Sequence, residues 1–266
     1  MKKGIAEILV LGDIFGNCGT DAVEKKLWKI RKDYEIDMVI ANGENAAEGS
    51  GINKEIADRL FSCGIDVITS GNHIFKKSSA YSLLENNEYV LRPANYPDEC
   101  PGSGWCIFDM NSYKVLVINV MGTVFMESLA SPFETVDRIL KREEGNFDFA
   151  VADIHAEATS EKIAFARFFD GRISGVFGTH THVQTADNQV LKNGTGYITD
   201  AGMCGPFDSV LGVESEIILK KFLTKMPVRH MEASGDVRIC GCIFSVDVGS
   251  GKCVKTERIC IAEDEI

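Results

Sequence analysis

Short apolar runs alternate with segments of helical spacing along most of the chain. The runs are rich in β-branched residues and end at polar loops, which is typical of buried strands. They cover residues 8–11, 38–41, 67–69, 115–120, 149–152 and 174–177. The segments between some of these runs predict helices over residues 20–32, 53–63 and 159–169.

A further helix is predicted to begin at Ser131. Ser131 is a capping residue, Pro132 takes the first helical position, and Glu134 follows three residues after the cap. From residue 238 to about residue 261 apolar and polar residues alternate, which predicts antiparallel strands. Strands that alternate with helices indicate a layered α/β fold. No repeat or low-complexity linker interrupts residues 1–266, so we expect a single domain.

Five of the predicted strands end at a loop rich in glycine, amides, acids or histidine. In α/β sheets ligands bind at the carboxyl ends of the strands, so we expect these loops to converge on one site. Four of the five histidines lie in these loops, and we expect the fifth, His230, to be structural. The loops carry Asp13, Glu44, Asn45, Asn72, His73, His155, His180 and His182.

The residue types in these loops favour a metal site. Nitrogen and oxygen donors without cysteine suit hard or borderline metals such as iron, manganese or zinc. Glu44 can bridge two cations through its two oxygens, and ions about 3.5–4 Å apart form the clamp of phosphoester-cleaving enzymes. His180 and His182 alternate along an extended segment, so both can contribute only if the ions lie between them. Glycines precede the ligands and are expected to permit tight turns: Gly12, Gly43, Gly71 and Gly178.

The composition is that of an ordinary soluble protein, with 45% hydrophobic and 25% charged residues. No stretch approaches the ~20 apolar residues needed to span a bilayer. The apolar run near the N-terminus stops at Asp13 and has no small-residue cleavage site. We therefore expect a buried first strand and a cytoplasmic protein that does not contact membranes. The nine cysteines are scattered without a CxxC pair, which favours reduced thiols.

The net charge of −11 argues against broad binding of nucleic acid, which needs a basic surface. It does not argue against a small anionic substrate, because bound cations reverse the sign of the potential locally. Two divalent cations would outweigh the charges of Asp13 and Glu44 and would attract a singly charged phosphodiester.

Seven motifs, in order from about residue 8 to residue 212, carry a resemblance to a known family. They are GDIFGNCG, ANGEN, SGNHIFKK, RPANYP, DIHAEATSEK, GTHTHVQTAD and TDAGMCGPFDSVLG. The chain resembles the YmdB-like bacterial metallophosphoesterases, a branch of the calcineurin-like superfamily. The resemblance implies a four-layer α-β-β-α sandwich. It also implies a phosphodiesterase acting on cyclic nucleotides, foremost 2′,3′-cyclic nucleotides, by attack of a metal-bridging hydroxide.

The resemblance further implies two metal ions, with iron or manganese favoured and zinc as the alternative. One ion would be held by Asp13, Glu44, Asn45 and His182. The other would be held by Glu44, Asn72, His155 and His180. His73, in the GNH motif, would be the general acid that protonates the leaving ribose oxygen, a role that suits the neutral-range pKa of histidine.

Some positions depart from what is usual in the superfamily or the family. Phe15 stands where a histidine ligand is usual, and the bridging carboxylate is Glu44 rather than aspartate. Ile74 follows His73 where an orienting acid is usual, so another residue must orient His73. Thr123 stands where the family carries an arginine.

Several alternatives stay open at this point. Asn45 could shape its loop as an Asx turn, and His73 could position phosphate without transferring a proton. Arg92 could bind phosphate bidentately or form a structural ion pair. The chain could also be a regulatory protein that binds nucleotides or RNA ends with slow hydrolysis, or a phosphomonoesterase that uses the same site. Self-association into a homo-oligomer is a further expectation.

Overall fold

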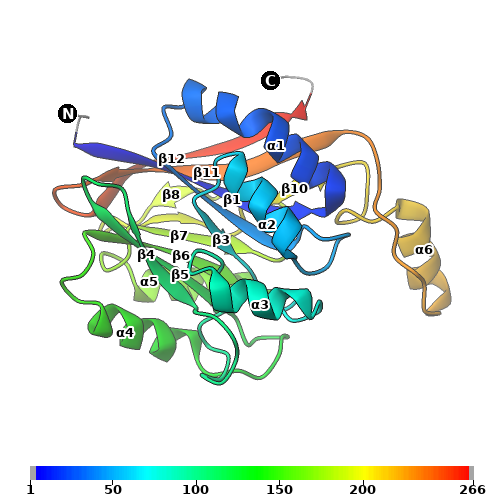
Figure 1. Cartoon of the computed structure of the whole chain (residues 1–266), viewed down its shortest axis with the longest axis horizontal. Coiled ribbons are helices and arrows are strands. Elements are labelled where there is room, and N and C mark those ends of the chain that lie inside the picture. Colours follow the sequence, from blue (N-terminus) through cyan, green and yellow to red (C-terminus); the bar gives the residue numbers. More distant parts are fainter. Residues whose placement is uncertain (1–3, 264–266) are drawn as a thin grey trace.

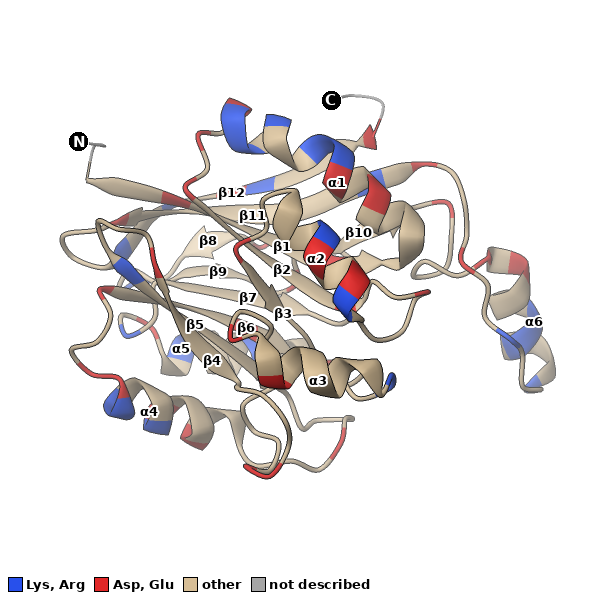
Figure 2. Ribbon diagram, viewed as in Figure 1, with Lys and Arg blue, Asp and Glu red and all other residues tan. Residues whose placement is uncertain are grey.

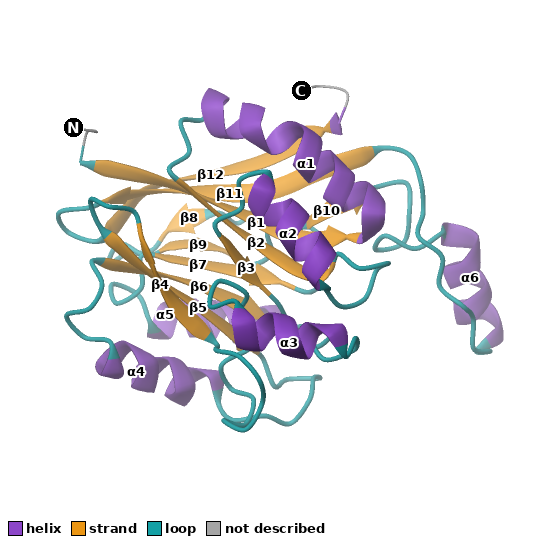
Figure 3. Ribbon diagram, in the orientation of Figure 1, coloured by secondary structure: helices purple, strands orange, loops and turns teal. Residues whose placement is uncertain are grey.

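The computed structural model describes residues 4–263. Two six-stranded sheets pack face to face, and helices cover the outer face of each sheet (Figures 1 and 3). This is the four-layer α-β-β-α sandwich that the family resemblance implies. Most of the charged residues are on the outer helices and the loops (Figure 2). Within the described residues, no helix is long and apolar enough to cross a membrane.

The first sheet has the strand order β12-β11-β10-β1-β2-β3. Its strands are β1 (Ile5–Phe15), β2 (Met38–Asn45), β3 (Val67–Thr69), β10 (Met203–Pro206), β11 (Val237–Asp247) and β12 (Lys252–Ala262). β1 pairs in parallel with β2 and β10, while β11 pairs antiparallel with β1, β10 and β12. The outer face is covered by α1 (Gly16–Asp33), α2 (Lys54–Ser62) and α3 (Ser79–Asn86).

The second sheet has the strand order β4-β5-β6-β7-β9-β8. Its strands are β4 (Trp105–Asp109), β5 (Lys114–Met121), β6 (Phe149–His155), β7 (Gly175–Thr179), β8 (Gln189–Val190) and β9 (Gly196–Ile198). The four central strands β5, β6, β7 and β9 are parallel. The outer face is covered by α4 (Pro132–Arg142) and α5 (Thr159–Phe168).

The alternation of side chains along β1 explains why the sheet is buried on both faces. Leu9 and Leu11 pack under α1 and α2, whereas Ile8 and Val10 pack against the second sheet. Successive residues of a strand point to opposite faces, so a continuous apolar run suits a strand in the middle of such a sandwich. The helix α6 (Ser215–Thr224) is different, because it projects away from the two sheets (Figure 1).

The predicted elements are present, but several strands are longer than their apolar runs. β1 continues to Phe15 and β2 continues to Asn45, because the ends of the two strands still pair with each other. The first helix begins at Gly16 rather than at residue 20. Ser131 caps α4 as predicted and accepts a hydrogen bond from the Glu134 amide. The pattern did not predict α3, α6, β4, β8, β9 or β10, most of which are short or weakly patterned.

Candidate active site

The carboxyl ends of the parallel strands from both sheets meet at one edge of the sandwich. β1 and β2 end with the predicted ligands of the first sheet, and the loop after β3 follows beside them. β6 ends with His155, and the loop after β7 begins with His180. The predicted site residues that lie together here are Asp13, Glu44, Asn45, Asn72, His73, His155, His180 and His182.

Four potential ligand atoms converge around the ring of His155. Its Nε2 lies 3.1 Å from Glu44 Oε1, 3.0 Å from Asn72 Oδ1 and 3.0 Å from His180 Nδ1. Glu44, His155 and His180 offer atoms that all lie within 4.8 Å of one another, close enough to share one metal ion. Glu44 and His155 are buried, so their side-chain atoms are shielded from hydrogen bonding with bulk water.

A buried hydrogen-bond chain fixes the tautomer of His155. Asp153, within β6, accepts hydrogen bonds from Thr179 Oγ1 at 2.7 Å and from Thr69 Oγ1 at 2.6 Å. The Thr179 hydroxyl has a single proton and donates it to Asp153. Thr179 Oγ1 can therefore only accept from His155 Nδ1, which lies 2.9 Å away. In the neutral ring, His155 Nε2 therefore presents its lone pair to the ligand cluster, as metal-binding histidines do.

In His180 and His182, the ring nitrogen that points away from the cluster also has a hydrogen-bond partner. His180 Nε2 faces the carboxylate of Glu157 at 3.2 Å, so its Nδ1 presents a lone pair to the cluster. His182 Nδ1 donates to the Leu211 carbonyl at 3.1 Å, so its Nε2 faces Asp13 Oδ1 at 3.6 Å. When these rings are neutral, the nitrogens and oxygens that meet here are acceptors without a donor, and a bound cation would satisfy all of them.

Asn45 sits at the centre of the second set of predicted ligands. Its amide nitrogen lies 3.4 Å from Asp13 Oδ1, 3.3 Å from Glu44 Oε1 and 3.2 Å from His182 Nε2. The two protons of the Asn45 amide thus face three acceptor atoms. A cation could take the place of this amide nitrogen between them. The predicted ligand atom, Asn45 Oδ1, instead accepts from His73 Nδ1 at 2.7 Å. Its role as a metal ligand stays a prediction and requires the amide to turn over.

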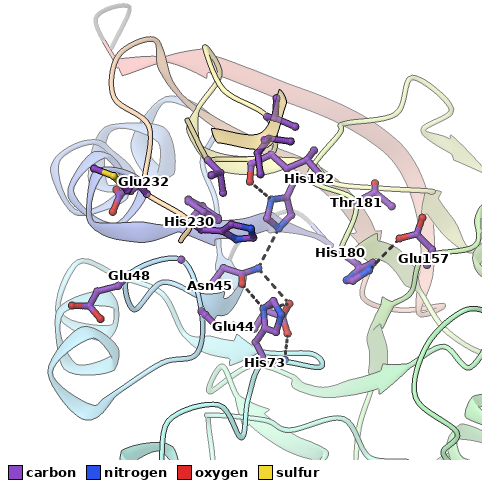
Figure 4. Close-up of a pocket in the computed structure, with 18 of the residues that line it drawn as sticks. Glu44, Asn45, Glu48, His73, Glu157, His180, Thr181, His182, His230 and Glu232 are labelled. Atoms are coloured by element: carbon purple, nitrogen blue, oxygen red, sulfur yellow. Dashed lines mark hydrogen bonds and ion pairs between the residues drawn. The ribbon is translucent and has the colours of Figure 1, made fainter. Parts of the chain in front are cut away.

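The hydrogen bond between Asn45 and His73 identifies the group that orients His73. The sequence alone did not predict this group. His73 Nδ1 is held by Asn45, and its backbone amide donates to Glu44 Oε2 at 2.9 Å. His73 Nε2 is left for a substrate. Figure 4 shows His73 beside Glu44 and Asn45, with His182 on the far side of Asn45. The asparagine therefore replaces the acid that usually follows this histidine in the superfamily.

The electrostatics of the cluster favour positive charge. Burial raises the pKa of Asp13, but His182, His155 and the His180 amide together outweigh it and hold this pKa well below its usual range. Burial lowers the pKa of His155, but the carboxylates of Glu44, Asp13 and Asp153 together outweigh it and raise this pKa to about 9. Burial and the nearby His155 lower the pKa of His180 to about 4, which keeps its ring neutral. Carboxylates that stay ionised in a buried pocket suit a cation site.

The loop that carries His180 and His182 is strained and firmly held. Both histidines have positive φ angles, 96° and 61°, which cost energy in a residue other than glycine. Thr181 lies between them and donates to Asp200 through its amide at 3.2 Å and its hydroxyl at 2.7 Å. Lys162, fully buried on α5, donates to Asp200 at 2.8 Å and to the Thr179 carbonyl at 2.7 Å.

The glycines before the ligands serve a different purpose from the one expected. Gly12, Gly43, Gly71 and Gly178 all lack positive φ, so turn conformation is not their function. Their reason is close approach. A Cβ at Gly71 would lie 2.2 Å from Cδ2 and Nε2 of His155, and a Cβ at Gly12 would lie 2.0 Å from the Gly202 carbonyl oxygen.

Other residues singled out in the sequence lie around this cluster. Phe15 cannot ligate, and its ring packs edge-on against His182 at 5.7 Å between centroids. Thr123 donates to Glu161 and does not line the cavity described below. Arg92 is buried outside that cavity, where Nη1 donates to the Pro93 carbonyl and Nε has no partner among the described residues. Phosphate binding by Arg92 stays a prediction.

A cavity of about 480 Å³ opens over the cluster. One side is formed by Glu44, Asn45, His73, His180 and His182, and the other by α6 and its flanking loops. His230, which the sequence indicated as a structural residue, is exposed and lines this cavity (Figure 4). Only the fold could reveal this, because His230 follows no predicted strand.

Comparisons with known proteins agree with this geometry. The family model for YmdB-like proteins matches residues 9–259. The chain belongs to the YmdB-like family. A 2′,3′-cyclic-nucleotide 2′-phosphodiesterase of Bacillus subtilis is 41% identical to it over 259 residues, covering 97% of this chain and 98% of the relative.

Solved structures of this family have the same fold. A crystal structure of a hypothetical protein from Thermus thermophilus matches with a TM-score of 0.90 and 40% identity, covering 96% of this chain and 99% of that one. The crystal structure of a phosphatase from Mycoplasma pneumoniae matches with a TM-score of 0.91 and 32% identity, covering 97% of this chain and 94% of that one.

Proposed function

We propose that this member of the YmdB-like family is a metal-dependent phosphodiesterase that opens 2′,3′-cyclic nucleotides to nucleoside 3′-phosphates. The observation that supports the proposal is the convergence of Glu44 Oε1, Asn72 Oδ1, His180 Nδ1 and His155 Nε2, four atoms of the types that bind metal ions. The activity of the Bacillus subtilis relative, at 41% identity over nearly the whole chain, supports the substrate class.

Asp13, Glu44 and His182 could hold one ion, and Glu44, Asn72, His155 and His180 the other, as the family resemblance implies. In this structure Asn45 Oδ1 orients His73, so Asn45 would join the first set only if its amide turned over. Glu44 lies between the sets, because its Oε1 is 3.1 Å from His155 Nε2 and 3.3 Å from the Asn45 amide nitrogen. Bound ions would supply Lewis acidity, an activated water and a positive clamp for the phosphate oxygens. Iron or manganese is our proposal for their identity, with zinc as the alternative, since imidazole and carboxylate ligands suit all three.

His73 is proposed as the general acid. Asn45 Oδ1 holds the Nδ1 proton, so the ring is oriented and Nε2 can carry the proton that the departing 2′ oxygen takes up. In the cyclic diester the bond from phosphorus to the 2′ oxygen breaks, and water supplies the new oxygen on phosphorus. The side chain of His73 is about one third exposed, 32%, so its proton is replenished from solvent.

A comparison of leaving groups tests this role. On 2′,3′-cAMP, His73→Ala is expected to lose about 10²-fold or more in kcat, because the ribose oxygen needs a proton. On bis(p-nitrophenyl) phosphate the loss is expected to be much smaller, since p-nitrophenolate leaves without one. The metal content of the variant, measured alongside, must equal that of the wild type. Equal losses on the two substrates would contradict the acid role and favour phosphate positioning.

Two rival functions are separable by experiment. A regulatory nucleotide-binding or RNA-end-binding protein would retain its cellular effect in a Glu44→Gln variant that still binds ligand. A phosphomonoesterase would hydrolyse nucleoside 3′-phosphates faster than cyclic diesters. The ordered hydrogen bonds of His73 favour the diesterase, because a poor ribose leaving group needs an acid. RNA ends as substrates, self-association and the cytoplasmic location stay predictions.

A further inference from the structure

One wall of the active-site cavity is apolar and comes from a part of the chain with no ligand residue. It is formed by α6 and the loops on either side of it. The members that face the cavity are Leu211, Val213, Ile218, Phe222 and Met231. Val213 and Ile218 are buried in a small cluster with Phe15, whereas Phe222 is 62% exposed and Met231 is 54% exposed. Two large apolar side chains thus stand open to solvent over a polar site.

His182 joins this wall to the predicted metal ligands. Its Nε2 faces Asp13, its Nδ1 donates to the Leu211 carbonyl at 3.1 Å, and its ring packs on Phe15. The wall therefore begins directly behind a predicted ligand. A molecule whose phosphate lies at the ligands can place its organic part against α6, because both border the same cavity. Ligand cavities commonly combine a few polar groups with an apolar lining of this kind.

The charges around the cavity limit what the organic part can be. No lysine or arginine is among the described residues that line the cavity, whereas three glutamates besides the predicted ligand Glu44 are: Glu48, Glu157 and Glu232. Each has a partner, namely Lys77, His180 and the amides at the start of α1. A ligand with several phosphates would meet these carboxylates, and Lys77, the lysine paired with Glu48, does not itself line the cavity. The cavity suits one phosphate joined to an uncharged, flat, apolar group.

We propose that Phe222 and Met231 form a subsite for the nucleobase of a single, free cyclic nucleotide. The subsite rests on the proposed function and concerns the part of the substrate that α6 contacts. A base offers an apolar π-face to the Phe222 ring, and stacking of this kind tolerates every base. The thioether of Met231 adapts to rings of different size. The subsite therefore accepts purines and pyrimidines and disfavours the ends of longer RNA chains.

Two substrates that share the reacting group but differ in the base test the subsite. 2′,3′-cAMP and glycerol 1,2-cyclic phosphate both have a five-membered cyclic diester, and only the first has a base. Phe222→Ala is expected to raise KM for 2′,3′-cAMP by roughly 10-fold, the loss typical of one base–aromatic contact. Its kcat/KM for the glycerol diester should stay within about twofold, and Phe222→Trp should restore the KM for 2′,3′-cAMP.

Leu223→Ala is the matched control. Leu223 neighbours Phe222 on α6, is 83% exposed and does not line the cavity, so both substrates should be turned over as by the wild type. Equal effects of Phe222→Ala on the two substrates, or none, would overturn the subsite. A change in molar mass, measured by light scattering, in both Phe222→Ala and Leu223→Ala would also overturn the subsite. The face of α6 would then be a contact between copies of the chain.

A binding measurement separates failure of the subsite from failure of the proposed function. Adenosine, which has no phosphate, should bind the metal-loaded wild type about 10-fold more tightly than Phe222→Ala in calorimetry. Equal affinity would overturn the subsite, whatever the turnover of diesters. Absence of diester turnover in a wild type that binds adenosine in this way would instead overturn the proposed function and leave the subsite supported.

Discussion

Lys162→Met is expected to destabilise the protein strongly, although Lys162 does not touch the predicted ligands. Its ammonium group is fully buried and pairs with Asp200, whose side chain is 1% exposed. Removing one partner of a buried pair typically costs about 3–5 kcal/mol in free energy of unfolding. Asp200 keeps its hydrogen bonds from Thr181 and Gly202, so we expect about 3 kcal/mol, the lower end of this range.

The loss should depend on pH in a defined direction. Burial raises the pKa of Asp200 above its ordinary value, with Lys162 acting against this rise. Without Lys162 the folded-state pKa rises further above the unfolded one, so the folded variant takes up a proton more readily. The penalty is then small below the unfolded pKa and grows as the pH rises through the folded pKa. The variant should therefore be more destabilised, relative to wild type, at pH 8 than at pH 5.

Urea unfolding of the metal-free protein at both pH values measures this effect. Arg167→Met is the matched control, because Arg167 lies on the same helix, is exposed, and should change stability by less than about 0.5 kcal/mol. Adding Asp200→Asn to Lys162→Met should recover part of the loss, since no buried charge then remains. A loss below about 1 kcal/mol for Lys162→Met at pH 8, or a larger loss at pH 5, would refute the pairing described here.

Two further changes test how the ligands are held. Gly71→Ala places a Cβ 2.2 Å from the His155 ring and should release the metal at that histidine, whereas Gly4→Ala, with open space around it, should retain the wild-type metal content by mass spectrometry. Wild-type metal content in Gly71→Ala would show that the ring has room to move. Thr179→Val removes the hydroxyl that links Asp153 to His155 and should weaken metal binding by about 10–100-fold in chelator competition. Unchanged affinity would mean that the tautomer of His155 is set by another group.

Most strands of the fold were predictable because each rests on a local pattern, whereas the four-layer arrangement was implied by the family resemblance. The apolar runs that became β2, β5 and β6 are too short and too continuous for surface helices, and their loops all carry polar residues. α6 had no such signal. Ile218 is its only buried residue, so the period that reveals most helices is nearly absent. The part of the chain that lines the cavity opposite the ligands was therefore missing from the sequence-based prediction.

The contacts within the site were less predictable than its members. Asn45 and His73 are 28 positions apart, and their hydrogen bond depends on how β2 and β3 are placed side by side. Lys162 sits in a motif that is typical of a solvated helix, and only the packing of α5 on the second sheet shows that it is buried. Sequence motifs specify which residue types gather, whereas register and packing decide which atoms meet.

The central claim is tested most directly by the product of one reaction. Metal-loaded wild type and Glu44→Gln would be incubated with 2′,3′-cAMP, and the products followed by phosphorus NMR. The wild type is expected to form adenosine 3′-phosphate as the sole product, because the bond to the 2′ oxygen breaks. Glu44→Gln, which lacks the carboxylate shared by the two ligand sets, is expected to form none. Adenosine 2′-phosphate as the product, or full activity in the variant, would contradict the central claim.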